Sequence, residues 1–465
     1  MSKPLWTAAE MTEATGGSAS ADFAVSGVSI DTRTLEPGDL FVALKGENGD
    51  GHLYVDGAFA KGAGAALVSQ KVDAKGPLFM VPDTLRGLEA LGVAARRRAL
   101  GKIAAVTGSV GKKSTKEALR VMLSGFGSTH ASAASYNNHW GVPLSLARMP
   151  RETGFGVFEI GKNHAGEIAP LARFVQPHAA IITTVEPVHI EFFSSGEAIA
   201  DEKGEIFAGL APGGAAIVNR DNPYFTLLRA KAERYGGRVL GFGAHREADA
   251  QLIALEPKGE GTVVTAVICG HPLTYFLGTP GRHMAMNSLA VLACAQAFGL
   301  TLNDAAARLA ELKPPKGRGA RSVIRLPGGS FTLIDESYNA NPASMRAALA
   351  LLGEAKPEKQ GRRIAVLGDM LELGVGGPAF HAGLAEAIER ADADLVYVSG
   401  ALMEHLWDVL PPYRRGARAQ TAGELAQILV GDLKPGDVVV VKGSFGSRMG
   451  QVVEALKSLA REAGN

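Results

Sequence analysis

The chain has 465 residues, a formal net charge of +1, 46% hydrophobic residues and 20% charged residues. This length suggests about three domains, and the balanced charge gives no overall basic field, so nucleic acid is not an expected partner. The sequence shows neither an apolar signal segment nor an apolar run of membrane-spanning length, and the two cysteines lie in apolar surroundings, so we expect a cytoplasmic protein without disulfides.

Residues 1–84 differ from the rest of the chain. They carry short apolar runs, FAVSGVSI, DLFVAL, GAALVS and PLFMVP, which are separated by the turn-forming stretches EPGD and GENGDGH. Short runs bounded by Gly, Pro, Asn and Asp are typical of strands joined by turns. We therefore predict a small α/β domain with few long helices.

Residues 85–315 alternate between apolar, strand-like runs and helical segments. The strand-like runs are KIAAVTG, GFGVFEIG, HAAIITTV and GGAAIVN, and a long helix, HMAMNSLAVLACAQAFG, follows them. Alternation of strand and helix predicts a mainly parallel sheet covered by helices.

Residues 316–465 repeat this alternation after a segment rich in Pro, Gly and cationic residues, LKPPKGRGAR, which we interpret as a linker. The strand-like runs here are FTLIDE, RRIAVLGD, ADLVYVSG and DVVVVKG. They predict a second, Rossmann-like sheet, and thus an α/β protein of three domains. Ligands bind where the strands of such sheets end, and polar clusters follow many of these strands.

The stretch IAAVTGSVGKKSTKEAL, Ile103 to Leu119, combines a strand, a glycine turn and the start of a helix. Glycines at such a turn let backbone N–H groups converge on a phosphate, and the helix N-terminus favours its charge. The full P-loop pattern is not met, because Val106 takes the place of the first glycine and Lys113 takes the place of Ser or Thr. An ordinary strand-to-helix turn is therefore an alternative for this stretch alone.

Three further polar residues follow strands or lie on a helix: Glu159, His189 and Lys203. A carboxylate and an imidazole near a triphosphate are suitable ligands for a divalent cation. Each residue also has a structural alternative: Glu159 as a helix cap, His189 as a hydrogen-bonded loop residue, and Lys203 as a solvated helix residue.

Taken in order, the motifs resemble those of the Mur ligases of peptidoglycan synthesis over nearly the whole chain. DTRTLEPGDLFVALKGENGDGHLYVDGAFAKGA resembles the uridine-nucleotide domain of the family, TGSVGKKSTKE its ATP loop, and YNNHWGVPLSL, EIGKNHAGEI and DEKGEIF its central-domain motifs. SYNANPASM and VLGDMLELG are typical of the members that add a dipeptide, and they argue against the sister ligases that add single amino acids.

The resemblance implies a reaction and its partners. ATP would phosphorylate the C-terminal carboxylate of UDP-N-acetylmuramoyl-tripeptide, and the amine of D-Ala-D-Ala would attack the acyl phosphate to form an amide. The implied domains are a UDP-muramoyl-peptide-binding domain (1–84), a central P-loop-type ATP-binding domain (85–315) and a C-terminal Rossmann-like domain (316–465). We expect a monomer. The third residue of the tripeptide, diaminopimelate or lysine, stays open.

The resemblance also implies the residues that bind ATP and Mg²⁺. Asn287 matches an adenine contact, Arg318 a phosphate contact and Asp335 a ribose contact. The full ATP set is Thr107, Gly108, Ser109, Val110, Gly111, Lys112, Lys113, Ser114, Thr115, Asn287, Arg318 and Asp335. The implied Mg²⁺ ligands are Ser114, Glu159, His189 and Lys203, and carbamylation would make Lys203 carboxylate-like. The implied catalytic residues are Lys112, Glu159, His189 and Lys203.

The substrate residues implied by the resemblance lie in all three parts of the chain. In the uridine-nucleotide domain they are Asp31, Thr32, Arg33, Lys45, Gly46, Asp50 and His52. In the central part, where the muramoyl group is expected, they are Asn137, Asn138, Asn163 and His164. In the third part, where the amino substrate is expected, they are Tyr338, Asn339, Asn341, Lys442, Ser444 and Arg448.

Lys113 departs from the family pattern, in which this position is Thr. A protonated ammonium cannot ligate Mg²⁺, and it brings like charge toward the metal. Three interpretations stay open: Ser114 replaces the missing ligand, Lys113 grips phosphate, or the ATP site is impaired and the protein only binds its ligands. We favour obstruction of the metal, which predicts that Lys113→Thr raises kcat, whereas a productive grip on phosphate predicts weaker ATP binding.

Overall fold

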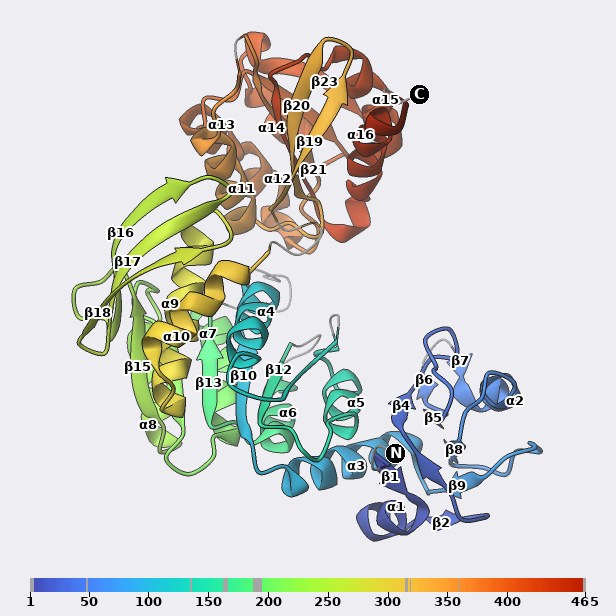
Figure 1. Cartoon of the computed structure of the whole chain (residues 1–465). Coiled ribbons are helices and arrows are strands. Elements are labelled where there is room, and N and C mark those ends of the chain that lie inside the picture. The colour runs from blue at the N-terminus through green and yellow to red at the C-terminus, as the bar shows by residue number, and fades with distance from the viewer. Residues whose placement is uncertain are drawn as a thin grey trace.

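The computed structural model describes residues 4–46, 49–133, 136–161, 166–186, 195–313, 317, 319–358 and 360–462. Three main sheets follow one another along the chain, from the blue N-terminal part to the red C-terminal part in Figure 1. The predicted α/β class is confirmed. In the part of the chain that is described, no helix has both the length and the apolar character needed to cross a membrane.

The first sheet has five short strands in the order β2-β9-β8-β5-β4, of which only β2 is antiparallel to its neighbour. The elements of this part are β1 (Trp6–Thr7), α1 (Ala8–Thr15), β2 (Ser18–Ala19), β3 (Ala24–Val25), β4 (Gly27–Ser29), β5 (Asp39–Val42), β6 (Lys45–Gly46), β7 (Gly49–Asp50), α2 (Val55–Ala60), β8 (Ala65–Val68) and β9 (Leu78–Met80). They confirm the predicted small α/β unit with short helices.

Helix α3 (Thr84–Arg98) joins the first sheet to the central one and packs on α5 (Gly141–Ala147). Leu88 and Leu91 of α3 share a buried core with Leu67 of the first sheet and Leu144 of α5. Gly92 permits the close approach, because a Cβ there would lie 3.0 Å from the Pro143 carbonyl oxygen. The first core therefore includes residues of the central part, and the exact domain boundaries stay a prediction.

The central sheet has nine strands in the order β11-β12-β10-β13-β14-β15-β16-β17-β18. The run from β11 to β16 is parallel, as predicted, and β17 and β18 extend it in antiparallel fashion, which the sequence analysis did not predict. The strands are β10 (Lys102–Thr107), β11 (Thr129–Ala131), β12 (Phe155–Glu159), β13 (Ala179–Ile182), β14 (Ala215–Asn219), β15 (Arg238–Gly243), β16 (Ala250–Lys258), β17 (Gly261–Ile268) and β18 (His271–Leu277).

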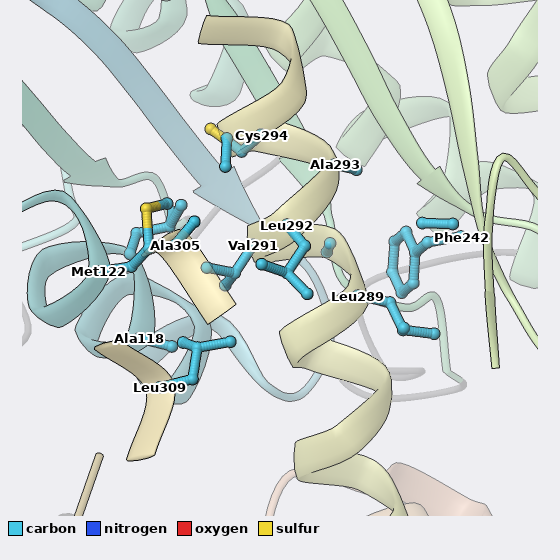
Figure 2. Close-up of a cluster of buried hydrophobic side chains, with 14 of the residues drawn as sticks. Ala118, Met122, Phe242, Leu289, Val291, Leu292, Ala293, Cys294, Ala305 and Leu309 are labelled. Carbon is cyan, nitrogen blue, oxygen red and sulfur yellow. The ribbon is translucent and has the colours of Figure 1, made fainter. Parts of the chain in front are cut away.

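Successive residues of β10 feed two cores, because side chains alternate across a strand. Ala104 and Val106 face α4 (Lys112–Leu123), α9 (Arg282–Phe298) and α10 (Leu302–Arg308), whereas Ile103 and Ala105 face α5, α6 (Ile168–Val175), α7 (Gly196–Gly204) and α8 (Phe225–Arg234). Figure 2 shows the first of these cores, in which Cys294 of α9 packs among apolar side chains. Cys294 thus packs as a small hydrophobic residue, in the apolar surroundings that its sequence context indicated.

The third sheet has six strands in the order β19-β20-β24-β21-β22-β23, and only β19 is antiparallel to its neighbour. Its strands are β19 (Ala320–Leu326), β20 (Gly329–Glu336), β21 (Arg363–Gly368), β22 (Leu395–Ser399), β23 (Arg415–Ala419) and β24 (Val438–Lys442). Helices α11 (Pro342–Glu354), α12 (Gly377–Ala382), α13 (Leu384–Arg390) and α14 (Glu404–Val409) cover one face, and α15 (Ala422–Asp432) and α16 (Gly450–Glu462) cover the other. The predicted Rossmann-like sheet is confirmed.

Candidate active site between the central and C-terminal sheets

A cavity of about 370 Å³ lies where parallel strands of the central sheet end and the C-terminal part of the chain meets them. Glu159 is the last residue of β12, Asn219 is the last of β14, and Thr183 follows β13 directly. From the C-terminal part, Glu336 at the end of β20 and Lys442 at the end of β24 complete the wall. Strand ends from two sheets thus converge on one space.

The glycine turn forms one side of this cavity and joins β10 to α4, as predicted. Gly108 (φ +149°) and Gly111 (φ +84°) adopt backbone conformations that other residues avoid. A Cβ at Gly108 would lie 1.9 Å from the Thr183 hydroxyl oxygen, and one at Gly111 would lie 3.1 Å from Asn287 Oδ1. The N-terminus of α4 and the backbone N–H groups before it therefore lie at the cavity wall, where they suit an anion.

The two lysines of the turn make different contacts. Lys112 Nζ donates a hydrogen bond of 2.5 Å to the Gly108 carbonyl oxygen within its own loop. Lys113 Nζ lies 4.2 Å from the centroid of the Tyr338 ring, which belongs to the C-terminal part of the chain. Both lysines line the cavity, as do Ser109, Val110 and Ser114. Lys113 is therefore an interdomain contact, which none of the three sequence-based interpretations includes.

Glu159 has an oxygen that suits a cation. The residue is 4% exposed, and its Oε1 accepts a hydrogen bond of 2.8 Å from Asn137 Nδ2. Its Oε2 is buried and has no hydrogen-bond partner within the described ranges. Because a buried carboxylate oxygen is costly to leave unpaired, the arrangement fits a divalent cation bound at Oε2.

The other predicted metal ligands are distributed differently. Ser114 lines the cavity. Lys203 is 4% exposed in the last turn of α7 and is not among the residues that line the cavity. His189 lies outside the described residues. Among those that are described, no group of three or more His, Cys, Asp or Glu side chains could hold a metal ion.

Lys442 anchors the C-terminal wall. Its side chain is 3% exposed, and Nζ lies 3.4 Å from Glu336 Oε2 and donates to the carbonyl oxygen of Asn339 at 2.7 Å. Asn341 caps α11 by accepting from the Ser344 N–H, and both residues also line the cavity. A buried cation is thus held in place beside the site, where it adds positive potential.

Models of known protein families match three successive parts of the chain. The description "Mur ligase family, catalytic domain" matches residues 24–107, "Mur ligase middle domain" matches 106–295, and "Mur ligase, glutamate ligase domain" matches 322–445. The chain belongs to the Mur ligase family. Members of this family are ATP-dependent amide ligases, and so is this chain.

Individual relatives match this Mur ligase over nearly its whole length. UDP-N-acetylmuramoyl-tripeptide–D-alanyl-D-alanine ligases from Escherichia coli (strain K12) and Bacillus subtilis (strain 168) are 36% and 34% identical, over 94% and 93% of this chain and 95% and 93% of their own lengths. A crystal structure of MurF from Acinetobacter baumannii has a TM-score of 0.86 at 29% identity, covering 98% of this chain and 99% of that one. MurF from Thermotoga maritima in complex with ADP has a TM-score of 0.79 at 27% identity, covering 94% and 98%.

Several residues that sequence analysis of this Mur ligase assigned to ligands have structural contacts instead of a place at the cavity. Asp335 is 1% exposed, accepts hydrogen bonds from Ser337 and lies 3.7 Å from Lys457 Nζ. Ser444 Oγ accepts from the Leu371 N–H, and Arg448 is exposed at a left-handed backbone position. Thr107 is buried beneath the turn, where its carbonyl oxygen accepts from the Thr183 N–H.

Two other residues implied by the resemblance line the cavity: Asn287, the implied adenine contact, and Asn339, an implied contact of the amino substrate. Asn138 Oδ1 accepts from the Gly141 N–H at the start of α5. Thr115 is fully buried behind the loop, and no hydrogen bond of its hydroxyl falls within the described residues. Asn163, His164 and Arg318 lie outside the described residues, as His189 does.

The predicted substrate residues of the N-terminal part are not among those that line the cavity. The Arg33 guanidinium pairs with Asp31 at 2.6 Å and lowers the pKa of that carboxyl group, and the Thr32 carbonyl oxygen accepts from Lys61. Lys45 and Gly46 are exposed in β6. His52 is 6% exposed, and its Nε2 accepts from the Ser69 N–H while Nδ1 lies 2.5 Å from Asp50 Oδ1, so both ring nitrogens hold the fold together.

Sequence analysis missed several residues that line the cavity of this Mur ligase. Burial raises the pKa of Glu186, and Arg346 opposes that shift, whereas burial lowers the pKa of His283. Their positions at or shortly after the end of an apolar strand could have revealed Thr183, Glu186 and Asn219. No comparable signal marks His283 and Met286, because α9 approaches the cavity only through tertiary packing. The residues missed are Thr183, Thr184, Glu186, Asn219, His283, Met286, Gly317, Glu336, Ala343, Ser344 and Ala347.

Proposed function

We propose that this Mur ligase joins D-Ala-D-Ala to UDP-N-acetylmuramoyl-tripeptide at the expense of ATP, through an acyl phosphate, and so makes the UDP-linked pentapeptide precursor of peptidoglycan. The observation that carries the proposal is the cavity itself, in which the glycine turn, the buried carboxylate of Glu159 and the buried cation of Lys442 meet. The names of the relatives and the dipeptide-type stretches SYNANPASM and VLGDMLELG support it.

The chemistry needs positioning and charge neutralisation rather than a protein nucleophile. A carboxylate is a poor electrophile at neutral pH, and transfer of the γ-phosphoryl group turns one of its oxygens into a leaving group. The amine nitrogen then forms the amide bond, and phosphate departs with that oxygen. The N–H groups of the turn and Lys112 would hold the phosphates, and Asn287 would contact adenine.

We further propose that Mg²⁺ binds at Glu159 Oε2 and supplies charge neutralisation at the phosphates. Ser114, His189 and carbamylated Lys203 are the other proposed ligands. Asn137 would hold the second oxygen of Glu159, so that Oε2 stays directed to the cation.

The remaining assignments belong to the same proposal. The uridine nucleotide would bind near residues 31–33, 45–46 and 50 of the first domain, and the amino substrate would bind near Asn339 and Lys442. The domains would span residues 1–84, 85–315 and 316–465. The enzyme would act as a monomer in the cytoplasm, where its ATP and nucleotide-linked substrate are made.

The test is a comparison of amino substrates, with the product measured by mass spectrometry. Purified protein with ATP, Mg²⁺ and UDP-N-acetylmuramoyl-tripeptide should form the pentapeptide with D-Ala-D-Ala and no product with single amino acids. Tripeptides that end in diaminopimelate or in lysine, run side by side, assign the third residue. A product with a single amino acid would favour a sister ligase, and binding of both substrates without product would favour a binder without catalysis, which no comparison supports.

A further inference from the structure

The contact between Lys113 and Tyr338 joins two parts of the chain that must act together. Lys113 begins α4 at the glycine turn, and Tyr338 follows β20 in the C-terminal part; Figure 1 shows these two parts stacked one above the other. The distance of 4.2 Å from Nζ to the ring centroid is within the range of a cation–π interaction. Both side chains are only partly exposed, which strengthens such a pair relative to one in open water.

Tyr338 is itself fixed to the segment that connects the two parts. Its backbone N–H donates to the Gly317 carbonyl oxygen at 3.1 Å, and a Cβ at Gly317 (φ +74°) would lie 2.9 Å from the Tyr338 Cβ. The ring of Phe445 packs on Tyr338 with a centroid separation of 6.2 Å. Tyr338 therefore links Lys113 both to the connecting segment and to the loop that follows β24.

The contacts of Tyr338 extend to the cavity through the next residue of the chain. Asn339, the residue after Tyr338, lines the cavity, and its carbonyl oxygen accepts from Lys442 Nζ at 2.7 Å. A displacement of Tyr338 would thus move Asn339 and the buried cation with it. Lys112, the residue before Lys113, donates a hydrogen bond to the Gly108 carbonyl oxygen of its own turn.

We propose that Lys113 is a positioning residue that fixes the C-terminal domain on the phosphate loop through Tyr338, and thereby couples the nucleotide site to the site of the amino substrate. The ammonium and the ring act as one interdomain pair. The inference rests on the proposed function for its kinetic consequences, and on geometry alone for its structural ones. It predicts the opposite change in activity from the one expected if Lys113 obstructs the metal, because removing the Lys113 cation should impair the enzyme rather than improve it.

The experiment is a double-mutant cycle on the full-length protein with Lys113→Met and Tyr338→Leu. Methionine keeps the length of the side chain without a charge and without a strong Mg²⁺ ligand. Each single change should raise the KM for D-Ala-D-Ala about two- to fivefold, and the double variant should be no worse than the poorer single variant. Lys113→Arg keeps a cation and Tyr338→Phe keeps an aromatic ring, so each of these variants should retain most of the coupling.

Two further measurements distinguish an interdomain role of the Lys113–Tyr338 pair from a general effect of removing a cation–π contact. Tyr413→Leu removes a ring that lies 5.5 Å from Arg414 within the C-terminal domain, and it should leave the KM unchanged. X-ray scattering with ADP present should show a larger radius of gyration for Lys113→Met than for the native protein. Additive effects of the two changes, or a higher kcat in Lys113→Met, would overturn the proposal. If the native protein forms no product at all, the proposed function fails, and scattering still tests the interdomain pair.

Discussion

Gly108→Ala is the perturbation whose effect the structure defines most closely. The new Cβ would lie 1.9 Å from the Thr183 hydroxyl oxygen and 3.2 Å from the Thr183 Cβ and backbone nitrogen, so the turn or the strand end must move. The backbone conformation at φ +149° adds strain of roughly 1–3 kcal/mol for a residue with a side chain. Displacing the Thr183 hydroxyl, which donates to the Val110 carbonyl oxygen at 2.5 Å and lies 3.3 Å from the Thr107 carbonyl oxygen, costs about 1 kcal/mol more.

Together these effects should lower the free energy of unfolding of the central domain by about 2–4 kcal/mol. That corresponds to a decrease of roughly 4–16 °C in its melting temperature. Because the same displacement moves the N–H groups that face the phosphates, ADP affinity measured by isothermal titration should fall as well. Thermal melting and titration are therefore both needed on each variant.

Gly213→Ala is the matched control. Gly213 also has a positive φ, +72°, but a Cβ there meets nothing within 4 Å. The Gly213→Ala change should lower the free energy of unfolding by only about 1 kcal/mol and leave ADP affinity unchanged. Adding Thr183→Ala to Gly108→Ala removes the closest atom and should recover part of the stability. A Gly108→Ala variant with the melting temperature of the Gly213→Ala variant and the ADP affinity of the native protein would contradict this reasoning. The close packing of the turn would then not be needed to form the site.

Three further changes test other parts of the site and the fold. Glu159→Gln should lower kcat roughly a hundredfold or more, because the side chain would lose the negative charge proposed to bind Mg²⁺; an unchanged kcat across a Mg²⁺ titration would contradict its role as a ligand. Lys203→Ala should lose activity that added bicarbonate does not restore, whereas Lys231→Ala, which removes a neighbouring lysine paired with Asp201, should stay active; equal rates in the two variants would argue against carbamylation. Burial, together with the charges of Arg96 and Lys102, lowers the pKa of His178 from 6.5 to about 4. Between pH 6.5 and pH 4, His178 therefore takes up a proton in the unfolded chain but not in the native protein. The free energy of unfolding, measured in urea, should therefore fall as the pH drops from 6.5 to 4, and His178→Gln should flatten that slope; a slope as steep in the variant would assign it to other groups.

The parallel parts of the sheets were predictable because their signal is local. The strands before Gly108, Glu159 and Lys442 are apolar runs that end at polar clusters, and parallel packing brings such ends together. The antiparallel strands β17 and β18 were missed, and the structure shows why for β17. Its residues alternate between buried and partly buried positions, which is typical of a strand with one covered face, but Val and Thr occur at both kinds of position in TVVTAVI. The alternation is therefore visible in the structure and not in the sequence.

The contacts between the parts of the chain were not predictable in the same way. Lys113 and Tyr338 are far apart in the sequence, and their meeting depends on how the third sheet sits against the central one. His52 illustrates the converse: the family resemblance implied a substrate contact, whereas tertiary packing gives both ring nitrogens partners within the protein. Side-chain roles at such positions are decided by neighbours that local sequence does not reveal.

We propose that the cavity between the central and C-terminal sheets is the place where ATP-dependent ligation occurs. The initial rate of phosphate release, measured with Mg-ATP and each combination of the two other substrates, tests this. Release should require both UDP-N-acetylmuramoyl-tripeptide and D-Ala-D-Ala, with one phosphate released for each pentapeptide formed. Release that is independent of D-Ala-D-Ala, or its absence when both substrates are present at saturating concentration, would contradict it.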